Sequence, residues 1–210
     1  MKIAVSFLSQ TDISATVAKI AASSADYIHV DVADGKYVPT KRLLPAEVSK
    51  YLTYTTKPLD VHLMVEKPLK YLPAFSLLNT EYLIFHCEIK EDINNIIETI
   101  KNTGIKPGLA LNPETAVEKV LPYINKIANV LILSVNPGMS GQSFMPEVLA
   151  KVAVLNEIRT AQGLDFAITI DGGINNETIA YCIDQGIDIC VVGSYICNSN
   201  NYDQKIAELR

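Results

Sequence analysis

The sequence has no tryptophan, only three histidines and no long apolar run, although 49% of its 210 residues are hydrophobic. A transmembrane helix needs about 18 consecutive apolar residues, and no segment approaches that length. We therefore expect no membrane-spanning segment. The apolar residues must instead lie in short segments, which is typical of strands that are covered on both faces.

Signals for export, nucleic-acid binding and disulfide formation are missing as well. The opening residues, MKIAVSFLSQTD, hold too short an apolar run for a signal peptide. The net charge is −5 and no basic run occurs, which argues against a nucleic-acid partner. The four cysteines form no CxxC pair, so buried, reduced thiols are expected. These absences predict a cytoplasmic globular protein with neither a membrane nor a nucleic acid as its partner.

What the sequence does contain is a regular alternation of two kinds of segment. Short apolar, β-branched runs recur at residues 2–7, 27–32, 59–65, 82–86, 106–111, 129–135, 166–171 and 189–193. Stretches with helical spacing lie between them, most clearly at residues 91–102, 146–159 and 175–186. Because a helix fits into almost every gap between the runs, the strands are expected to be parallel.

Two α/β architectures fit this alternation, an open doubly wound sheet and a closed barrel. The count of eight strand–helix units favours the barrel, and no linker composition divides the chain. We therefore predict a single (β/α)8 TIM barrel domain over residues 1–210, with short loops because each unit has only about 26 residues.

Unusual polar residues gather where the predicted strands end, which is where both architectures place their chemistry. His29 and Asp31 are two positions apart on one strand and therefore point to the same face. His62 lies in the next predicted strand, and Asp171 ends the seventh. These four side chains could meet around one divalent ion, and mixed N/O ligation suits zinc, iron, cobalt or manganese. The alternative is a hydrogen-bonded polar pair inside the barrel.

Glycine-containing segments supply a second signal. Gly172-Gly173 and Gly193-Ser194 end the last two strands, where barrels commonly bind phosphate through backbone N–H groups. Tight turns are the alternative interpretation. The glycine-containing loop 136–142 could move over a site or be an ordinary turn. No dinucleotide or P-loop motif is present. His86 is interpreted as a core histidine with Glu88 as its neighbour.

Taken together, five segments resemble the motifs of ribulose-phosphate 3-epimerases: IHVDVADGKYVP, LDVHLMVEKP, NPGMSGQSF, TIDGG and VVGS. The resemblance runs from Lys2 to about Ala207. It implies a barrel of the ribulose-phosphate-binding type, one divalent metal ion (Zn, Fe, Mn or Co) and no organic cofactor. It also implies conversion of D-ribulose 5-phosphate to D-xylulose 5-phosphate, a step of the pentose phosphate pathway, through a metal-stabilised enediolate. A homo-oligomer is expected on the same ground.

The resemblance assigns roles to individual residues. It makes His29, Asp31, His62 and Asp171 the metal ligands, and it makes Asp31 and Asp171 the acid/base pair. Two carboxylates suit this chemistry, because epimerisation removes a proton on one face of a carbon and returns one to the other. The residues expected to bind substrate and phosphate are Ser6, His62, Gly138, Met139, Ser140, Gly141, Gly172, Gly173, Gly193 and Ser194.

Departures from the family pattern keep other functions open. Ala33 and Leu133 stand where methionine is usual, and Met139 and Ser140 replace Phe and Gly. Several segments are similar to allulose-6-phosphate 3-epimerases, and the changes at Ala33 and Met139 could make room for one more carbon. A non-catalytic sugar-phosphate-binding relative is a further alternative. Decarboxylases and aldol-type synthases on similar barrels are less favoured, because no predicted strand ends on a catalytic lysine.

Overall fold

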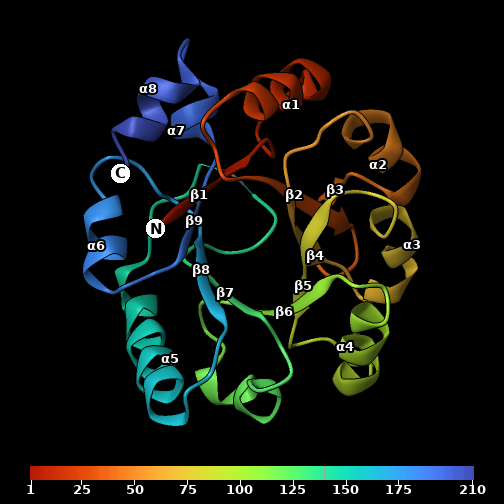
Figure 1. Cartoon of the computed structure of the whole chain (residues 1–210), viewed down its shortest axis with the longest axis vertical. Coiled ribbons are helices and arrows are strands. Elements are labelled where there is room, and N and C mark those ends of the chain that lie inside the picture. The colour runs from red at the N-terminus through yellow and green to blue at the C-terminus, as the bar shows by residue number, and fades with distance from the viewer. Residues whose placement is uncertain (140) are drawn as a thin grey trace.

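Eight parallel strands close into a barrel in the computed structural model, which describes residues 1–139 and 141–210 (Figure 1). The strands are β1 (Lys2–Ser6), β2 (Tyr27–Asp34), β4 (Leu59–Met64), β5 (Thr80–His86), β6 (Lys106–Leu111), β7 (Asn129–Leu133), β8 (Ala167–Asp171) and β9 (Ile189–Val192). They pair in the order β1-β9-β8-β7-β6-β5-β4-β2, and pairing of β1 with β2 closes the ring. The predicted (β/α)8 TIM barrel is confirmed.

One short strand was not expected from the sequence. β3 (Lys41–Arg42) pairs antiparallel with the end of β2, outside the ring. The Arg42 side chain donates hydrogen bonds to the carbonyl oxygens of Phe7 and Gln10. The segment that follows β2 is thereby tied to the loop that follows β1, at the end of the barrel where the polar residues lie.

Helices surround the barrel (Figure 1). They are α1 (Ile13–Ala22), α2 (Pro45–Leu52), α3 (Leu72–Phe75), α4 (Ile93–Lys101), α5 (Leu149–Gln162), α6 (Ile179–Asp184), α7 (Ser194–Cys197) and α8 (Tyr202–Ala207). Short 3-10 turns add Pro68–Lys70, Val117–Lys119, Leu121–Tyr123 and Pro146–Val148. In α4, which confirms the helical spacing of residues 91–102, the four isoleucines are buried, and Asp92 caps the helix by accepting from two backbone N–H groups.

Two of the predicted helices begin later than the sequence pattern indicates. The segment 146–159 opens with the 3-10 turn before α5, which then runs on to Gln162 and ends at Gly163. The segment 175–186 becomes helical only at Ile179. At the beginning of this segment Asn175 forms a turn, in which its side-chain oxygen accepts from the backbone N–H groups of Glu177 and Thr178.

The apolar core has two layers. The larger layer lies between strands and helices and includes Val30 and Val32, which alternate along β2 with the polar residues of the barrel interior. The smaller layer fills the barrel with side chains such as Tyr27, Tyr82 and Leu131. The four cysteines are free and buried, as predicted. Within the described ranges, no helix is both long and apolar enough to cross a membrane.

Candidate metal and substrate site

The inner faces of β2 and β4 present a square of polar side chains. His29 is the register partner of Asp60, and Asp31 is the partner of His62. Since the members of each pair on one strand are two residues apart, all four point into the barrel. None is more than 5% exposed. Two imidazoles and two carboxylates therefore alternate in a region from which water is excluded.

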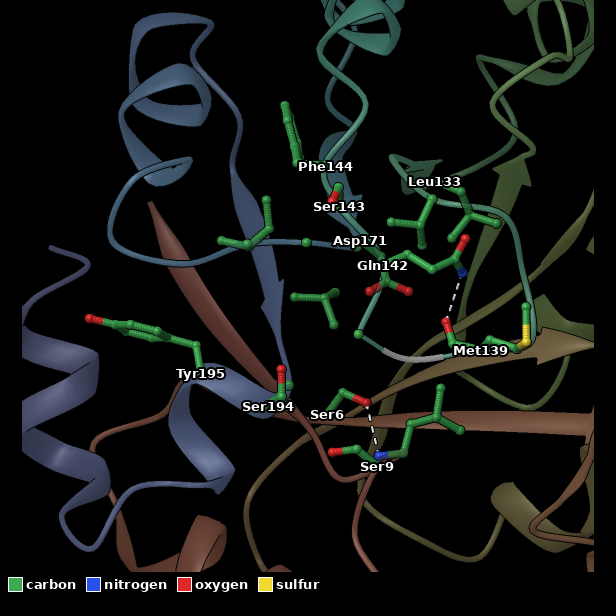
Figure 2. A pocket seen from close by; sticks show the side chains of 18 of the residues that line it. Ser6, Ser9, Leu133, Met139, Gln142, Ser143, Phe144, Asp171, Ser194 and Tyr195 are labelled. Carbon is green, nitrogen blue, oxygen red and sulfur yellow. Dashed lines mark hydrogen bonds between the residues drawn. The ribbon is translucent and has the colours of Figure 1, made fainter.

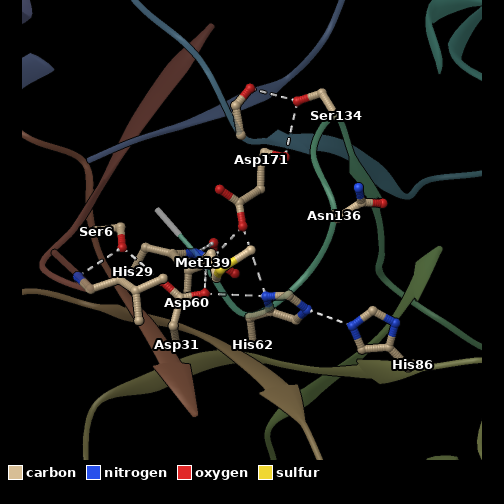
Figure 3. Close-up of polar contacts among 12 residues, drawn as sticks. Ser6, His29, Asp31, Asp60, His62, His86, Ser134, Asn136, Met139 and Asp171 are labelled. Atoms are coloured by element: carbon tan, nitrogen blue, oxygen red, sulfur yellow. Dashed lines mark hydrogen bonds and ion pairs between the residues drawn. The ribbon is translucent and has the colours of Figure 1, made fainter. Parts of the chain in front are cut away.

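Asp171, at the end of β8, joins this square from the other side of the barrel (Figure 3). Asp31 Oδ1 lies 3.4 Å from His29 Nε2 and 3.3 Å from His62 Nδ1. Asp171 Oδ2 lies 3.8 Å from the same two nitrogens. One atom from each of the four residues is within 4.8 Å of all the others. The structure thus brings together the four side chains that the sequence singled out.

These four atoms fit a divalent cation. Ligands about 2.1 Å from a tetrahedral zinc ion are roughly 3.4 Å apart, close to the separations within this group. His29 Nδ1 lies 2.8 Å from Asp60 Oδ2, whereas His29 Nε2 is buried without a hydrogen-bond partner. Such a buried imidazole nitrogen can bind a cation in place of a proton. The donor set of two nitrogens and two oxygens suits a transition metal rather than magnesium or calcium.

The same surroundings shift the pKa values of Asp31 and Asp171 in opposite directions. Burial disfavours ionisation of Asp31, but the imidazoles of His29 and His62 outweigh burial and hold its pKa well below the usual range. The hydroxyl of Ser6 also donates to Asp31 Oδ2 over 2.7 Å. Burial, together with the charge of Asp31, raises the pKa of Asp171 to about 6. Paired groups whose pKa values are separated in this way can serve as base and acid.

The protonation of His29 follows from the same charges. Burial disfavours its imidazolium form, but the carboxylates of Asp31 and Asp60 more than offset burial and raise the pKa of His29 well above its usual value. This positive charge balances part of the negative charge of the cluster. A divalent cation at the same place would substitute for it.

A cavity of about 740 Å³ opens above the cluster (Figure 2). Its lining includes these predicted site residues: Ser6, Asp31, His62, Gly138, Met139, Gly141, Asp171, Gly172, Gly173, Gly193 and Ser194. His29 lies beneath the floor, and Ser140 falls outside the described residues. Among the described lining residues there is no lysine or arginine. A phosphate bound here would therefore be held by backbone N–H groups and hydroxyls.

The glycines after β8 allow a close approach of two loops. Gly172 and Gly173 have φ of +121° and +67°, which favour glycine. A Cβ on Gly173 would lie 2.5 Å from the backbone nitrogen of Phe144. The Ser134 hydroxyl bridges the carbonyl oxygens of Asp171 and Gly172 over 2.9 and 2.6 Å. The glycine pair thus forms a tight turn, as one of the two interpretations had it, and this turn faces the cavity.

The segment after β2 contacts the loop that the sequence marked as able to cover a site. The hydroxyl of Thr40 donates to the carbonyl oxygen of Gly138 over 2.7 Å. Ala33 packs in a small buried cluster with Val38 and Met64 and does not line the cavity. Position 33 therefore faces this buried cluster and is separated from the cavity, which Met64 of the same cluster lines.

Sequence reasoning missed two sets of polar partners. Asp60 forms the hydrogen bond to His29, and its position two residues before His62 was the available signal. His86 Nε2 lies 2.9 Å from His62 Nε2, and His86 Nδ1 lies 3.1 Å from Glu88 Oε2. Burial lowers the pKa of His86 to about 4. Burial opposes ionisation of Glu88, but the hydrogen bonds from His86, Thr115 and the Asn112 backbone, together with the charge of His86, outweigh burial and lower the pKa of Glu88 to about 2.

Comparisons with known proteins agree with this arrangement. The family model described as "Ribulose-phosphate 3 epimerase family" matches residues 2–197. A ribulose-phosphate 3-epimerase of Bacillus subtilis is 37% identical over 187 residues, covering 89% of this chain and 86% of that protein. One from Helicobacter pylori strain J99 is 36% identical over 207 residues, covering 99% and 94%. Among solved structures, KGPDC from Streptococcus mutans superposes with a TM-score of 0.72 at 12% identity, covering 99% and 94%, which shows the fold alone.

Proposed function

The chain belongs to the ribulose-phosphate 3-epimerase family, and we propose that it interconverts D-ribulose 5-phosphate and D-xylulose 5-phosphate by acid/base catalysis between Asp31 and Asp171. The observation that carries the mechanism is the meeting of His29, Asp31, His62 and Asp171, of which the last three line the cavity. Two of these residues are carboxylates with separated pKa values, which is the arrangement that proton removal and return require.

The two carboxylates reach the cavity from different strands. Asp31 comes from β2 and Asp171 from β8, and β1 and β9 lie between these strands in the ring. One carboxylate takes the C3 proton from one face of the substrate, and the other gives a proton to the opposite face. In the reverse direction their roles are exchanged. The Ser6 hydroxyl, which donates to Asp31 Oδ2, holds that carboxylate in place.

The ligands of the divalent cation are His29 Nε2, Asp31 Oδ1, His62 Nδ1 and Asp171 Oδ2. When bound, a zinc, iron, manganese or cobalt ion supplies a Lewis acid for the negative charge that develops on the substrate oxygens. Asp60 orients His29 for this role by accepting its Nδ1 proton. The chemistry needs no organic cofactor.

The glycine-containing loops that line the cavity bind the phosphate of the substrate. Gly172, Gly173, Gly193 and Ser194 offer backbone N–H groups close to a ligand, since glycine carries no Cβ. Gly138, Met139 and Gly141 lie in the facing loop. These contacts orient the substrate away from the reacting carbon, so that C3 is presented to the carboxylates.

The test combines metal analysis with isotope exchange. Purified protein is loaded with zinc or manganese and incubated in D2O with ribulose 5-phosphate, and deuterium at C3 is followed by NMR. Incorporation is expected in the wild type and is expected to be lost in Asp31→Asn and Asp171→Asn. Absence of exchange in metal-loaded wild type would refute the proposal. The same reaction with allulose 6-phosphate tests whether the protein accepts a substrate that is one carbon longer. Exchange with allulose 6-phosphate alone would show that the hexulose phosphate, and not ribulose 5-phosphate, is the substrate.

The family resemblance supports two further proposals, a homo-oligomeric state and a cytoplasmic location. Sedimentation equilibrium tests the first, and a single-chain mass at micromolar concentration would contradict it. Cell fractionation with antibody detection tests the second.

A further inference from the structure

A chain of buried polar groups extends from His62 away from the cavity. His62 Nε2 faces His86 Nε2 at 2.9 Å, and His86 Nδ1 faces Glu88 Oε2 at 3.1 Å. Both imidazoles are fully buried, and neither His86 nor Glu88 lines the cavity. These two residues therefore cannot touch the substrate. They can act only through His62, whose other nitrogen, Nδ1, faces Asp31 and Asp171.

We propose that His86 and Glu88 are positioning residues that hold His62 in the tautomer with its lone pair on Nδ1, and that they thereby set the affinity of the site for a divalent cation. The inference rests on the proposed function, since it takes His62 Nδ1 as a ligand. A neutral imidazole with a lone pair on Nδ1 carries its proton on Nε2. That proton needs an acceptor, and His86 Nε2 is the atom placed to accept it. His86 can accept there only if its own proton is on Nδ1, which points at Glu88.

The direction of every hydrogen bond in this chain is set by Glu88. Its Oε1 accepts from the backbone N–H of Asn112 over 2.9 Å, and its Oε2 lies 3.3 Å from the Tyr37 hydroxyl. That hydroxyl itself accepts from the Asn112 side-chain amide, so its proton is free to point at Glu88. With His86, three donors converge on one carboxylate. Only the ionised form, which has acceptors and no proton, satisfies all of them.

The surroundings keep both members of the pair in place. The Tyr37 ring lies over His86 with its centroid 4.5 Å away, which fixes the plane of the imidazole. Lys151 donates to the carbonyl oxygen of Asn112 over 2.8 Å and so holds the backbone that binds Glu88. Each of the two histidines of the proposed metal site is thus linked by hydrogen bonds to a carboxylate outside the site. His29 has a carboxylate in direct contact, Asp60, whereas His62 has one at the far side of a second imidazole.

The opposite tautomer shows why this support matters. With its proton on Nδ1, His62 would donate to Asp31 Oδ1, 3.3 Å away, and would have no lone pair for a cation. Glu88→Gln imposes this state. The backbone N–H of Asn112 requires the Gln oxygen at the Oε1 position, so the NH2 group takes the place of Oε2 and faces both His86 Nδ1 and the Tyr37 hydroxyl, which accepts instead of donating. His86 then carries its proton on Nε2, His62 must accept it, and the His62 proton moves to Nδ1.

The test measures Zn²⁺ binding and the imidazole proton positions. Zn²⁺ affinity is obtained by chelator competition for the wild type, Glu88→Gln and His86→Phe, and the tautomers come from long-range ¹H–¹⁵N NMR. Both variants are expected to bind Zn²⁺ about 10- to 100-fold more weakly than the wild type. In the metal-free proteins, the His62 proton is expected on Nε2 in the wild type and on Nδ1 in Glu88→Gln.

Phe85→Leu is the matched control, because Phe85 is buried on β5 next to His86 but belongs to the outer layer between strands and helices. Its Zn²⁺ affinity is expected to equal that of the wild type despite lower stability. Affinities within twofold of the wild type in Glu88→Gln, which keeps the side-chain size, would overturn the proposal. If the wild type binds Zn²⁺ but does not epimerise ribulose 5-phosphate, the proposed function fails and the positioning role stands. If it epimerises and the variants bind normally, the positioning role fails alone.

Discussion

Replacement of Gly173 by alanine tests whether the turn after β8 depends on close backbone contact. Gly173 has φ of +67°, and an added Cβ would lie 2.5 Å from the nitrogen and 2.8 Å from the Cα of Phe144. Both are backbone atoms, so neither can rotate away. The left-handed conformation costs an alanine about 1–2 kcal/mol, and the enforced shift of a packed segment costs about 1–3 kcal/mol. We therefore expect the free energy of unfolding to fall by about 2–5 kcal/mol.

Gly163→Ala provides the matched control. Gly163 ends α5 with φ of +61°, and in the described part of the chain no atom lies within 4 Å of the Cβ it would gain. This variant carries the backbone strain without the steric conflict, so a loss of about 1–2 kcal/mol is expected. Urea denaturation of both variants, with unchanged slopes, measures the difference.

The two substitutions are also expected to differ in function. A shift of Phe144 disturbs residues 136–139 and 141–144, which contribute much of the cavity lining. The KM for ribulose 5-phosphate is therefore expected to rise in Gly173→Ala and to stay unchanged in Gly163→Ala, whose site lies beyond the cavity. Equal losses of stability in the two variants, with equal KM values, would refute the argument that Phe144 leaves no room for a Cβ.

Three other substitutions have expected outcomes of their own. Asp31→Asn is expected to lower kcat by about 10² to 10⁴, the usual contribution of an acid/base group, and near-normal turnover in a coupled assay would exclude the residue from proton transfer. Asp60→Ala removes the carboxylate that orients His29 and is expected to weaken Zn²⁺ binding about 10- to 100-fold in chelator competition, whereas an unchanged affinity would contradict that role. The pKa of Asp171 is raised to about 6, so its contribution to folding is complete below its ordinary pKa of 3.8 and is lost as the pH rises through 6. Metal-free Asp171→Asn is therefore expected to gain up to about 3 kcal/mol relative to the wild type between pH 4 and pH 7, and a pH-independent difference in urea titrations would count against the shift.

The barrel and the grouping of the four polar side chains could be anticipated because both are indicated by short-range periodicity. Alternate residues of a strand point to opposite faces, so His29 and Asp31 had to share a face whatever the register. The carboxyl ends of the strands lie at one end of a barrel, so His62 and Asp171 were expected at the same end as this pair. The register, which makes Asp31 the direct partner of His62, has no local signal in the sequence.

Features that depend on tertiary contacts could not be predicted in this way. His86 has the same sequence environment as a core histidine, and it is the pairing of β4 with β5 in this register that places its Nε2 against His62. The late start of α6 has a similar cause, because Asn175 and Thr178 form a hydrogen-bonded turn that competes with the helix. The packing of Val38 against Ala33 likewise depends on a loop whose path the strand pattern does not determine.

The charge of the chain constrains how an anionic substrate can bind. The net charge is −5, and the charged side chains among the described residues of the cavity lining are Asp31, Asp171 and Glu177, all acidic. A sugar phosphate entering this cavity meets carboxylates at one end, where repulsion in a water-excluded site is strongest. Affinity must therefore come from backbone N–H groups at the glycine turns and from positive charge held between the carboxylates. Because that positive charge would lie on the cation, the affinities for cation and substrate must be coupled, each strengthening the other by the same factor.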